Sequence, residues 1–227
     1  MPYNARQQNK TALYTHQAGP RQDSGGHKIP LEGLIRDLFQ KNGFDLSGEQ
    51  IEKFVIYLEE LKRWNRIHNL TALKRDEEII IRHFLDSITV SLCLEEKGVK
   101  VDGLSVCDVG SGAGFPGVPL KIYYGNRIDL TLVEAVAKKC AFLEYLRVKL
   151  GLSYRVVCKE AQKLQEEFDL VVCRALGKLK DILPLLQRLS RGYILIMKGS
   201  EVPEGYAYCK IDLKDIKSYI LFLAKSR

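Results

Sequence analysis

The 227-residue sequence has no apolar run as long as a membrane span, and its first residues do not form a signal peptide. It has six cysteines but no C-x-x-C pair, and most of the cysteines lie inside apolar runs. We therefore expect reduced core thiols in a cytoplasmic protein, with neither a metal site nor a disulfide framework. These absences exclude the membrane-spanning class and the small, disulfide-rich secreted class.

The remaining composition is ordinary for a globular protein with a sizeable core. Apolar residues make up 46% of the chain, whose length suits one large domain or one domain with an appendage. The net charge of +7 and the pI of about 9.0 indicate an acidic partner, most commonly nucleic acid. In residues 1–28, four Lys or Arg oppose one Asp, and the polar composition predicts a disordered tail or leader.

The most informative stretch runs from Leu104 to Leu120. Residues 104–109 form a short apolar run that predicts a buried strand, and glycines follow at positions 110, 112, 114 and 117. Such glycines are typical of a turn with unusual backbone angles or close approach to a ligand. Pro116 and Pro119 suit the first turn of a helix. The succession of strand, glycine turn and helix is typical of the first unit of a nucleotide-binding α/β sheet.

Two kinds of ligand compete for this turn. Residues 112–117 satisfy G-x-G-x-x-G, the dinucleotide fingerprint, but counting from the first glycine after the strand puts Phe115 at the third glycine position. Asp108, at the end of the strand, would repel a pyrophosphate, and it would favour the ammonium and sulfonium groups of S-adenosylmethionine. We therefore predict a methyl-donor loop. An NAD-type Rossmann oxidoreductase is the alternative.

Helices are predicted before the glycine loop. One covers residues 31–41, a second begins with a capping box formed by Ser47 and Gln50, and Asp76 is expected to cap a third. Cations gather at the end of the second helix, where they suit the helix dipole, and contact with phosphate is the alternative. These cations are Lys62, Arg63 and Arg66.

The predicted third helix carries a polar group, His83, Asp86 and Ser87, whose spacing places the three side chains on one face. One interpretation is that they line a substrate pocket. The other is that Asp86 or Ser87 satisfies a half-buried His83 by hydrogen bonding, as part of helix packing. From the spacing alone we prefer the packing interpretation.

Strands and helices alternate after the glycine loop. We expect strands over 128–133, 154–158, 168–173 and 193–197, a helix over 137–150, and two closing strands over 206–213 and 219–224, antiparallel at the sheet edge. The run 168–173, apolar except for Asp169, predicts a central strand. Polar side chains follow five of the strands, and parallel strands bring them to one sheet edge, where such sheets bind ligands. They are Asp108, Glu134, Glu160, Arg174 and Lys198.

The segment Asp108–Leu120, preceded by Arg82–Ser87, resembles the RsmG (GidB) family of 16S rRNA guanine-N7 methyltransferases. Residues 132–139, 173–175 and 197–199 fall in the family's order and spacing, and the likeness runs from about residue 47 to 200. The resemblance implies a class I S-adenosylmethionine-dependent methyltransferase fold. This is an α/β, Rossmann-like, doubly wound and mostly parallel sheet, here with an N-terminal helical extension. It also implies methylation of guanine 527 in the 530 loop.

The resemblance also implies which residues bind the donor. The expected donor-binding set is Asp108, Gly110, Gly112, Gly114, Phe115, Glu134, Glu160, Ala161 and Arg174. Glu134 takes the ribose position of the wider fold, and Arg174 is expected to grip the donor's carboxylate. The family often has an acid at the place of Ala161, whereas here the acid is Glu160. This difference leaves backbone groups as the expected contact on the adenine side.

We assign the catalytic role to His83, Asp86 and Arg174. Guanine N7 carries an in-plane lone pair and has no proton to lose, so the reaction needs no general base, metal or covalent nucleophile. Catalysis would come mainly from orientation, with acceptors near the base favoured because the base gains positive charge.

The expected partner is 16S rRNA or an assembly intermediate of the small subunit, bound by a monomer. Phosphate contacts are expected from Lys138, Lys139, Lys178, Lys180, Arg188 and Lys198, with Arg191 beside them. A non-catalytic rRNA-binding assembly factor remains a further alternative. We expect a tail over 1–28, a helical extension over 29–97 and a methyltransferase core over 98–227.

Overall fold

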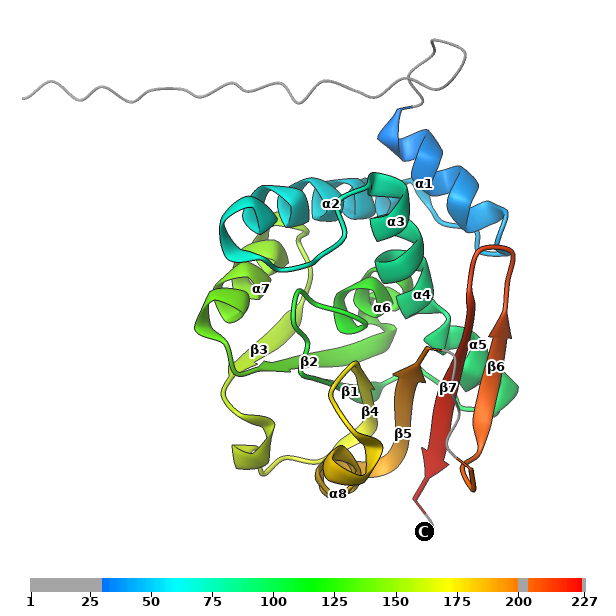
Figure 1. Ribbon diagram of the computed structural model, residues 1–227, viewed down its shortest axis with the longest axis vertical. Coiled ribbons are helices and arrows are strands. Elements are labelled where there is room, and N and C mark those ends of the chain that lie inside the picture. The colour runs from blue at the N-terminus through cyan, green and yellow to red at the C-terminus, as the bar shows by residue number, and fades with distance from the viewer. Residues whose placement is uncertain (1–29, 200–203, 226–227) are drawn as a thin grey trace, which may run out of the picture. The chain divides into compact units, whose positions relative to one another are not determined.

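The computed structural model describes residues 30–199 and 204–225 (Figure 1), so the expected tail over 1–28 lies outside the described residues. The α-helices are α1 (Leu31–Gln40), α2 (Gly48–His68), α3 (Asp76–Ile79), α4 (Asp86–Ile88), α5 (Val90–Glu96), α6 (Gly117–Tyr124), α7 (Ala137–Lys149) and α8 (Leu179–Leu189). The π-helix η1 (Ile80–Leu85) joins α3 to α4, and two short 3-10 helices are η2 (Gly125–Arg127) and η3 (Ala161–Lys163). The strands are β1 (Leu104–Val109), β2 (Ile128–Glu134), β3 (Tyr154–Cys158), β4 (Phe168–Arg174), β5 (Ser190–Lys198), β6 (Tyr208–Asp212) and β7 (Lys217–Ala224).

The strands form one sheet in the order β3-β2-β1-β4-β5-β7-β6. Strands β1 to β5 are parallel, and β7 pairs antiparallel with both β5 and β6. The apolar run Val171–Cys173 lies in β4, at the centre of the sheet, and its side chains are buried. The predicted α/β class, the central strand and the antiparallel closing strands are confirmed.

Helices cover both faces of the sheet. Side chains of α8, including Leu186, pack with Val171 and Cys173 on one face, while α1, α2, α6 and α7 cover the other face (Figure 1). Because successive strand residues point to opposite faces, Val172 of the same strand packs into the second, larger cluster. The doubly wound arrangement therefore follows from strands that are apolar on both sides.

The predicted start of α2 is confirmed, and that of the following helix is wrong. Ser47 accepts a hydrogen bond from Gln50 N, and Gln50 Oε1 accepts one from Ser47 N, which completes the capping box. Asp76 does not cap a helix, because Arg75 holds the N-cap position and Asp76 pairs with Lys62 Nζ at 2.5 Å. The helix that follows contains the π-helix η1, so its side chains do not keep the α-helical spacing.

Four cysteines are joined in disulfides, which corrects the expectation of reduced thiols. Cys93 of α5 is bonded to Cys209 of β6, and Cys140 of α7 is bonded to Cys158 at the end of β3. The partners are 116 and 18 residues apart in the sequence. Because the fold brings them together, no short sequence motif such as C-x-x-C indicates the pairing. Cys107 and Cys173 are buried free thiols, as expected for the remaining two.

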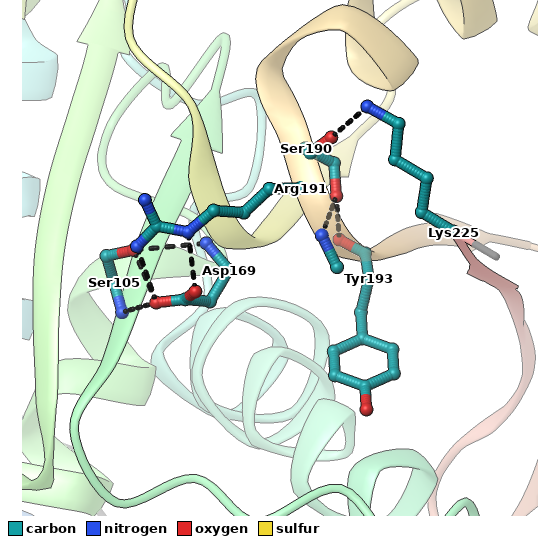
Figure 2. A network of polar contacts seen from close by, with 7 residues as sticks. Ser105, Asp169, Ser190, Arg191, Tyr193 and Lys225 are labelled. Atoms are coloured by element: carbon teal, nitrogen blue, oxygen red, sulfur yellow. Dashed lines mark hydrogen bonds and ion pairs between the residues drawn. The ribbon is translucent and has the colours of Figure 1, made fainter. Parts of the chain in front are cut away.

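A polar network joins three strands near their amino ends. Asp169 of β4 accepts hydrogen bonds from Ser105 N at 2.9 Å and Ser105 Oγ at 2.7 Å, and from Arg191 Nε at 2.7 Å (Figure 2). Nearby, Lys225 Nζ donates to the carbonyl of Ser190 at 2.8 Å (Figure 2). Arg191, expected beside the phosphate contacts, therefore holds β5 to β4 and β1. We name Ser105, Asp169 and Arg191 the strand clamp.

Candidate active site

The glycine loop follows β1, and its backbone needs residues without a side chain. Gly110 and Gly114 have φ values of +71° and +103°, in the left-handed region. A Cβ on Gly114 would lie 2.7 Å from the hydroxyl oxygen of Tyr57, which is fully buried on α2. The Tyr57 hydroxyl donates to the carbonyl of Ala113 at 2.5 Å. Tyr57 therefore sets the position of the loop from the helix below it.

Stacked aromatic rings connect Tyr57 to the polar side chains of the site. Tyr57 stacks on Phe84 with ring centroids 4.9 Å apart, and on Phe115 of the loop at 5.4 Å. His83 stacks on Phe115 at 4.5 Å, and the guanidinium of Arg174 lies 5.1 Å from the same ring. Phe115 thus joins the glycine loop to the polar side chains of η1 and β4.

Asp108 is fully buried at the end of β1. Its Oδ2 accepts a hydrogen bond from Gly117 N at 2.9 Å, while its Oδ1 is buried with no hydrogen-bond partner. Burial raises the pKa of Asp108 to about 7, partly offset by the bond from Gly117 and by the charge of Arg174. A buried carboxylate oxygen without a partner suits a nearby cation.

Glu134 lies at the end of β2, beside the glycine loop. Its Oε2 accepts a hydrogen bond from Gly112 N at 2.8 Å, and its Oε1 accepts one from Val136 N at 2.8 Å. Each carboxylate oxygen can accept a second hydrogen bond. The predicted ribose-binding acid therefore stands at the loop, and the same contacts fix its orientation.

The turn after β3 is joined to α8 through its backbone carbonyl groups. The Glu160 side chain is exposed and pairs with Lys163 Nζ at 3.2 Å. Arg188 of α8 donates to the carbonyl oxygens of Ala161 at 3.3 Å and Gln162 at 3.0 Å. Arg188, expected to contact phosphate, therefore fixes this turn, because the last turn of α8 packs beside η3.

His83 is a neutral imidazole with both ring nitrogens engaged. Arg174 Nη2 lies 3.1 Å from Nδ1, and since arginine can only donate, Nδ1 accepts and the ring proton sits on Nε2. Nε2 then donates to Thr71 Oγ1 at 2.8 Å, and the 3.2 Å approach of Nδ1 to the carbonyl of Arg82 is not a hydrogen bond. Burial, together with the charge of Arg174, lowers the pKa of His83 to about 4.

Neither Asp86 nor Ser87 forms a hydrogen bond with the His83 ring. The packing interpretation, which expected one of them to do so, is therefore wrong, and the partners of the ring are Thr71 and Arg174. Ser87 Oγ donates to the backbone carbonyl of His83, and Ser87 is fully buried. Asp86 Oδ2 instead lies 3.5 Å from Arg174 Nη1. Burial raises the pKa of Asp86, and Arg174 partly offsets this rise.

A cavity of about 660 Å³ opens beside these side chains. His83, Asp86 and Arg174 line it together with Lys198 at the end of β5, and its apolar lining includes Met197. An apolar cavity with a few convergent polar groups is the usual form of a small-molecule site. We name it the substrate cavity. Arg174, which lines the cavity, also contacts the ring of Phe115 in the glycine loop.

The other cations expected at phosphates are distributed around this edge. Lys138, Lys178 and Lys180 are exposed, Lys139 and Lys198 are half-buried, and none of the five forms an ion pair within residues 30–199 and 204–225. Lys138 and Lys139 lie in the first turn of α7, and Lys178 precedes α8. Their contact with RNA stays a prediction.

The sequence reasoning did not identify Tyr57 and Thr71 as site residues. Tyr57 lies on the apolar face of α2, where its type and spacing are those of any core aromatic. Thr71 lies in the connection between α2 and α3, which has no periodic pattern. The N-x-T sequence that contains Thr71 matches a glycosylation sequon, which gives no indication of its contact with His83.

The part of the chain that the structure describes contains no helix long and apolar enough to cross a membrane. Among the same residues, no group of three or more His, Cys, Asp or Glu is placed to hold a metal ion.

Comparison with known sequences gives a family. Residues 50–217 match the GidB family, described as rRNA small subunit methyltransferase G. The chain is 52% identical over 194 residues to the ribosomal RNA small subunit methyltransferase G of Aquifex aeolicus (strain VF5), which covers 83% of this chain and 98% of the relative. It is 38% identical over 180 residues to the protein of the same name from Macrococcus caseolyticus (strain JCSC5402), with 73% of each covered.

Solved structures show the same fold. The chain superposes with a TM-score of 0.55 on magnesium protoporphyrin IX methyltransferase (ChlM) from Synechocystis PCC 6803 with bound SAM, at 17% identity, covering 80% of this chain and 98% of that one. A SAM-dependent methyltransferase from Aquifex aeolicus gives a TM-score of 0.51 at 16% identity, covering 69% and 96%. At this level of identity the likeness concerns the fold, which is that of class I methyltransferases.

Proposed function

Because this chain belongs to the GidB family of rRNA small subunit methyltransferases, we propose that it transfers a methyl group from S-adenosylmethionine to guanine N7 in 16S rRNA. We propose guanine 527 of the 530 loop as the target. The observation that carries the proposal is the family match over residues 50–217, which contains the glycine loop, the His83 helix and Arg174. The oxidoreductase and the non-catalytic assembly factor are not favoured, because the relatives are named methyltransferases.

The residues of the glycine loop fit S-adenosylmethionine, which when bound supplies an activated methyl group on a sulfonium. The unpartnered Oδ1 of Asp108 suits its positive charge, and the second lone pairs of Glu134 suit two ribose hydroxyls. A Cβ on Gly112 would meet only the carbonyl of Gly110, at 3.9 Å, so this face of the loop is open to a ligand. The backbone N–H of Ala161 is assigned to the adenine, because the carbonyl of Ala161 already accepts hydrogen bonds from Arg188 and Leu164 N.

Arg174 is assigned to the donor's carboxylate, because a guanidinium recognises a carboxylate through paired hydrogen bonds. It lies at the edge of the substrate cavity and contacts Asp86 and His83 there. Binding of the donor's carboxylate by Arg174 should therefore affect Asp86 and His83, which contact the same guanidinium.

In the substrate cavity the side chains orient the base and do not take a proton from it. His83 is neutral and its ring nitrogens are occupied, so it adds no positive charge near a ring that becomes positively charged. The Asp86 carboxylate is assigned to the N–H groups on the Watson–Crick edge of guanine. Holding N7 in line with the methyl–sulfur bond then supplies the main rate enhancement.

We further propose that the protein acts in the cytoplasm as a monomer, on rRNA or on an assembly intermediate of the small subunit. The helices before β1, over 29–97, are assigned as an extension that supports the methyltransferase core over 98–227. Tyr57 and His83 both come from this extension and contact Phe115 of the glycine loop, which supports the role of the extension in holding the loop.

Deletion of the gene tests the function. Small-subunit rRNA from the deletion strain should resist borohydride–aniline cleavage at the target guanine, whereas rRNA from the parent should be cleaved there. Complementation with the wild-type gene or with Lys100→Gln should restore cleavage, since Lys100 is exposed and lies outside the substrate cavity. Complementation with Asp86→Asn should not. Cleavage that persists in the deletion strain would contradict the proposal.

A further inference from the structure

A second cavity, of about 680 Å³, lies at the carboxyl end of α2 and under the connection to α3. We name it the α2-end cavity. Its polar lining consists of Lys62, Asn65, Arg66, Asn69, Thr71 and Lys74. It is distinct from the substrate cavity, because no residue lines both.

The charge in the α2-end cavity is of one sign. Three of its lining residues are cations and none is an acid. Lys62 pairs with Asp76 at 2.5 Å, but Arg66 and Lys74 are exposed and form no ion pair among residues 30–199 and 204–225. The acids that follow Asp76 are engaged too, since Glu77 and Glu78 both pair with Arg75 at 3.6 Å. Two cations beside amide and hydroxyl groups suit an anionic ligand with polar edges.

Two hydrogen-bonded residues, Thr71 and His83, connect this cavity to the substrate cavity. Thr71 lines the α2-end cavity, and its hydroxyl accepts the hydrogen bond from His83 Nε2 at 2.8 Å. His83 in turn lines the substrate cavity. Thr71 is held in place because its N–H donates to Asn65 Oδ1 at 2.8 Å, and its hydroxyl also accepts from Leu73 N at 3.2 Å.

We propose that the α2-end cavity binds a phosphate of the RNA nucleotide next to the target guanine, through Arg66 and Lys74. The proposal rests on the proposed function, because a base in the substrate cavity brings its neighbouring phosphate to the other side of the Thr71–His83 pair. RNA is the occupant because its backbone is both anionic and continuous with the substrate. Single-stranded RNA loops present splayed bases and exposed phosphates in this way.

The test compares Arg66→Gln/Lys74→Gln with a matched pair, Arg36→Gln/Lys100→Gln. Arg36 and Lys100 are also exposed, carry the same two charges and line neither cavity. Binding of unmethylated 16S rRNA is measured by filter retention with S-adenosylhomocysteine present. The first pair should weaken binding about tenfold, and should flatten the plot of log affinity against log salt by about 0.7 for each phosphate that is no longer neutralised. Equal effects of the two pairs would overturn the proposal.

Ethylation interference locates the phosphate. Ethylation of the phosphate next to the target guanine should exclude rRNA from the wild-type complex, and Arg66→Gln/Lys74→Gln should tolerate it. The same interference pattern in both proteins, or a difference only at distant phosphates, would overturn the assignment. A loss of binding confined to substrates that carry ribosomal proteins would assign the cavity to a protein instead of RNA.

These measurements need no methyl transfer, so they separate the two proposals. If the rRNA-binding difference is found but no 7-methylguanosine forms, the proposed function fails, and the α2-end cavity still binds an RNA phosphate but not one defined by a target guanine. If methylation proceeds and the two variant pairs bind equally, the phosphate site fails alone. Thermal unfolding of both pairs checks that each variant is folded.

Discussion

Asp108 holds its carboxyl group beneath the glycine loop, with one oxygen bonded to Gly117 N and the other without a partner. At the scale of single residues, burial and a few neighbouring groups determine the protonation state of each side chain. The same two influences make His83 neutral, whereas sequence alone suggests a group that titrates near neutral pH. Residue type predicted which side chains gather in the site, and the surroundings determine their state.

Replacing Asp108 by Asn should change how stability depends on pH. The pKa of Asp108 is about 7 in the folded protein and about 3.9 in an unfolded chain, so folding takes up a proton between these values. The wild type should therefore lose stability relative to Asp108→Asn as pH rises from 4 to 7, by on the order of 3 kcal/mol. Urea unfolding of both proteins across this range measures the difference. Parallel curves would show that Asp108 does not titrate there.

Removing the Tyr57 hydroxyl should loosen the glycine loop. Tyr57→Phe leaves the carbonyl of Ala113 without its buried donor, which costs about 1–3 kcal/mol of stability. The ring stacking on Phe115 remains, so the loss should concern loop position and reduce the affinity for S-adenosylmethionine. Calorimetric titration measures that affinity.

Tyr145→Phe is the matched control, because Tyr145 is half-buried on α7 and its hydroxyl has no hydrogen bond among the described residues. If both variants bind S-adenosylmethionine as the wild type does, the loop does not depend on Tyr57.

At the scale of elements, the strands were predicted closely and the helix around His83 was not. Runs such as 104–109 and 154–158 coincide with β1 and β3. A short, mostly apolar run bounded by turn residues is typical of a buried strand. The π-helix η1 adds one residue to a turn and has no signature in composition. His83 and Asp86 both line the substrate cavity, as their shared face predicts, whereas Ser87 is fully buried and bonds to the backbone of His83. The contacts of His83 and Asp86 with Arg174 and Thr71 could not be predicted from that spacing.

The disulfides should contribute to stability by restraining the unfolded chain. Reduction, or Cys93→Ser with Cys209→Ser, opens a link across 116 residues, while the Cys140 pair spans 18. The usual dependence on loop length gives losses of about 5 and 3 kcal/mol respectively. Thermal unfolding with and without dithiothreitol measures them. An unchanged transition, with six thiols titratable before reduction, would show that the bonds do not form in solution.

The strand clamp should make stability fall in acid. Hydrogen bonding to Arg191 and Ser105 lowers the pKa of Asp169, so its contribution is present above about pH 4 and is lost as pH falls below that. Asp169→Asn should cost about 2 kcal/mol at pH 7, and this cost should become smaller as pH falls below the unfolded pKa of about 3.9 toward the lowered pKa of the folded protein. Urea unfolding at pH 7 and at pH 3 gives both values.

Glu166→Gln is the matched control for the clamp. Glu166 pairs with Arg155, and both side chains are 50% exposed, so its loss should cost less than about 1 kcal/mol. A cost for Asp169→Asn no larger than that for Glu166→Gln would show that the clamp does not stabilise the sheet.

For the whole molecule, the convergence of polar groups at one sheet edge was predictable, and the joining of remote segments was not. Asp108, Glu134 and Arg174 follow parallel strands, and topology alone brings them together. Tyr57 and Thr71 enter the site from the helices before β1, which depends on tertiary packing that one sequence does not reveal. The same limit explains the missed cysteine pairs.

The outer strand β6 ends the sheet with a row of backbone groups that no further strand pairs among the described residues. Its outward residues are Tyr208, Lys210 and Asp212, and Cys209 and Ile211 point inward. Charged side chains on such an edge discourage a second sheet from adding to it. Concentrated solutions of the protein should therefore stay clear and free of fibrils, which light scattering and thioflavin fluorescence would register. An apolar replacement, Lys210→Val with Asp212→Val, should turn this edge into a template for aggregation.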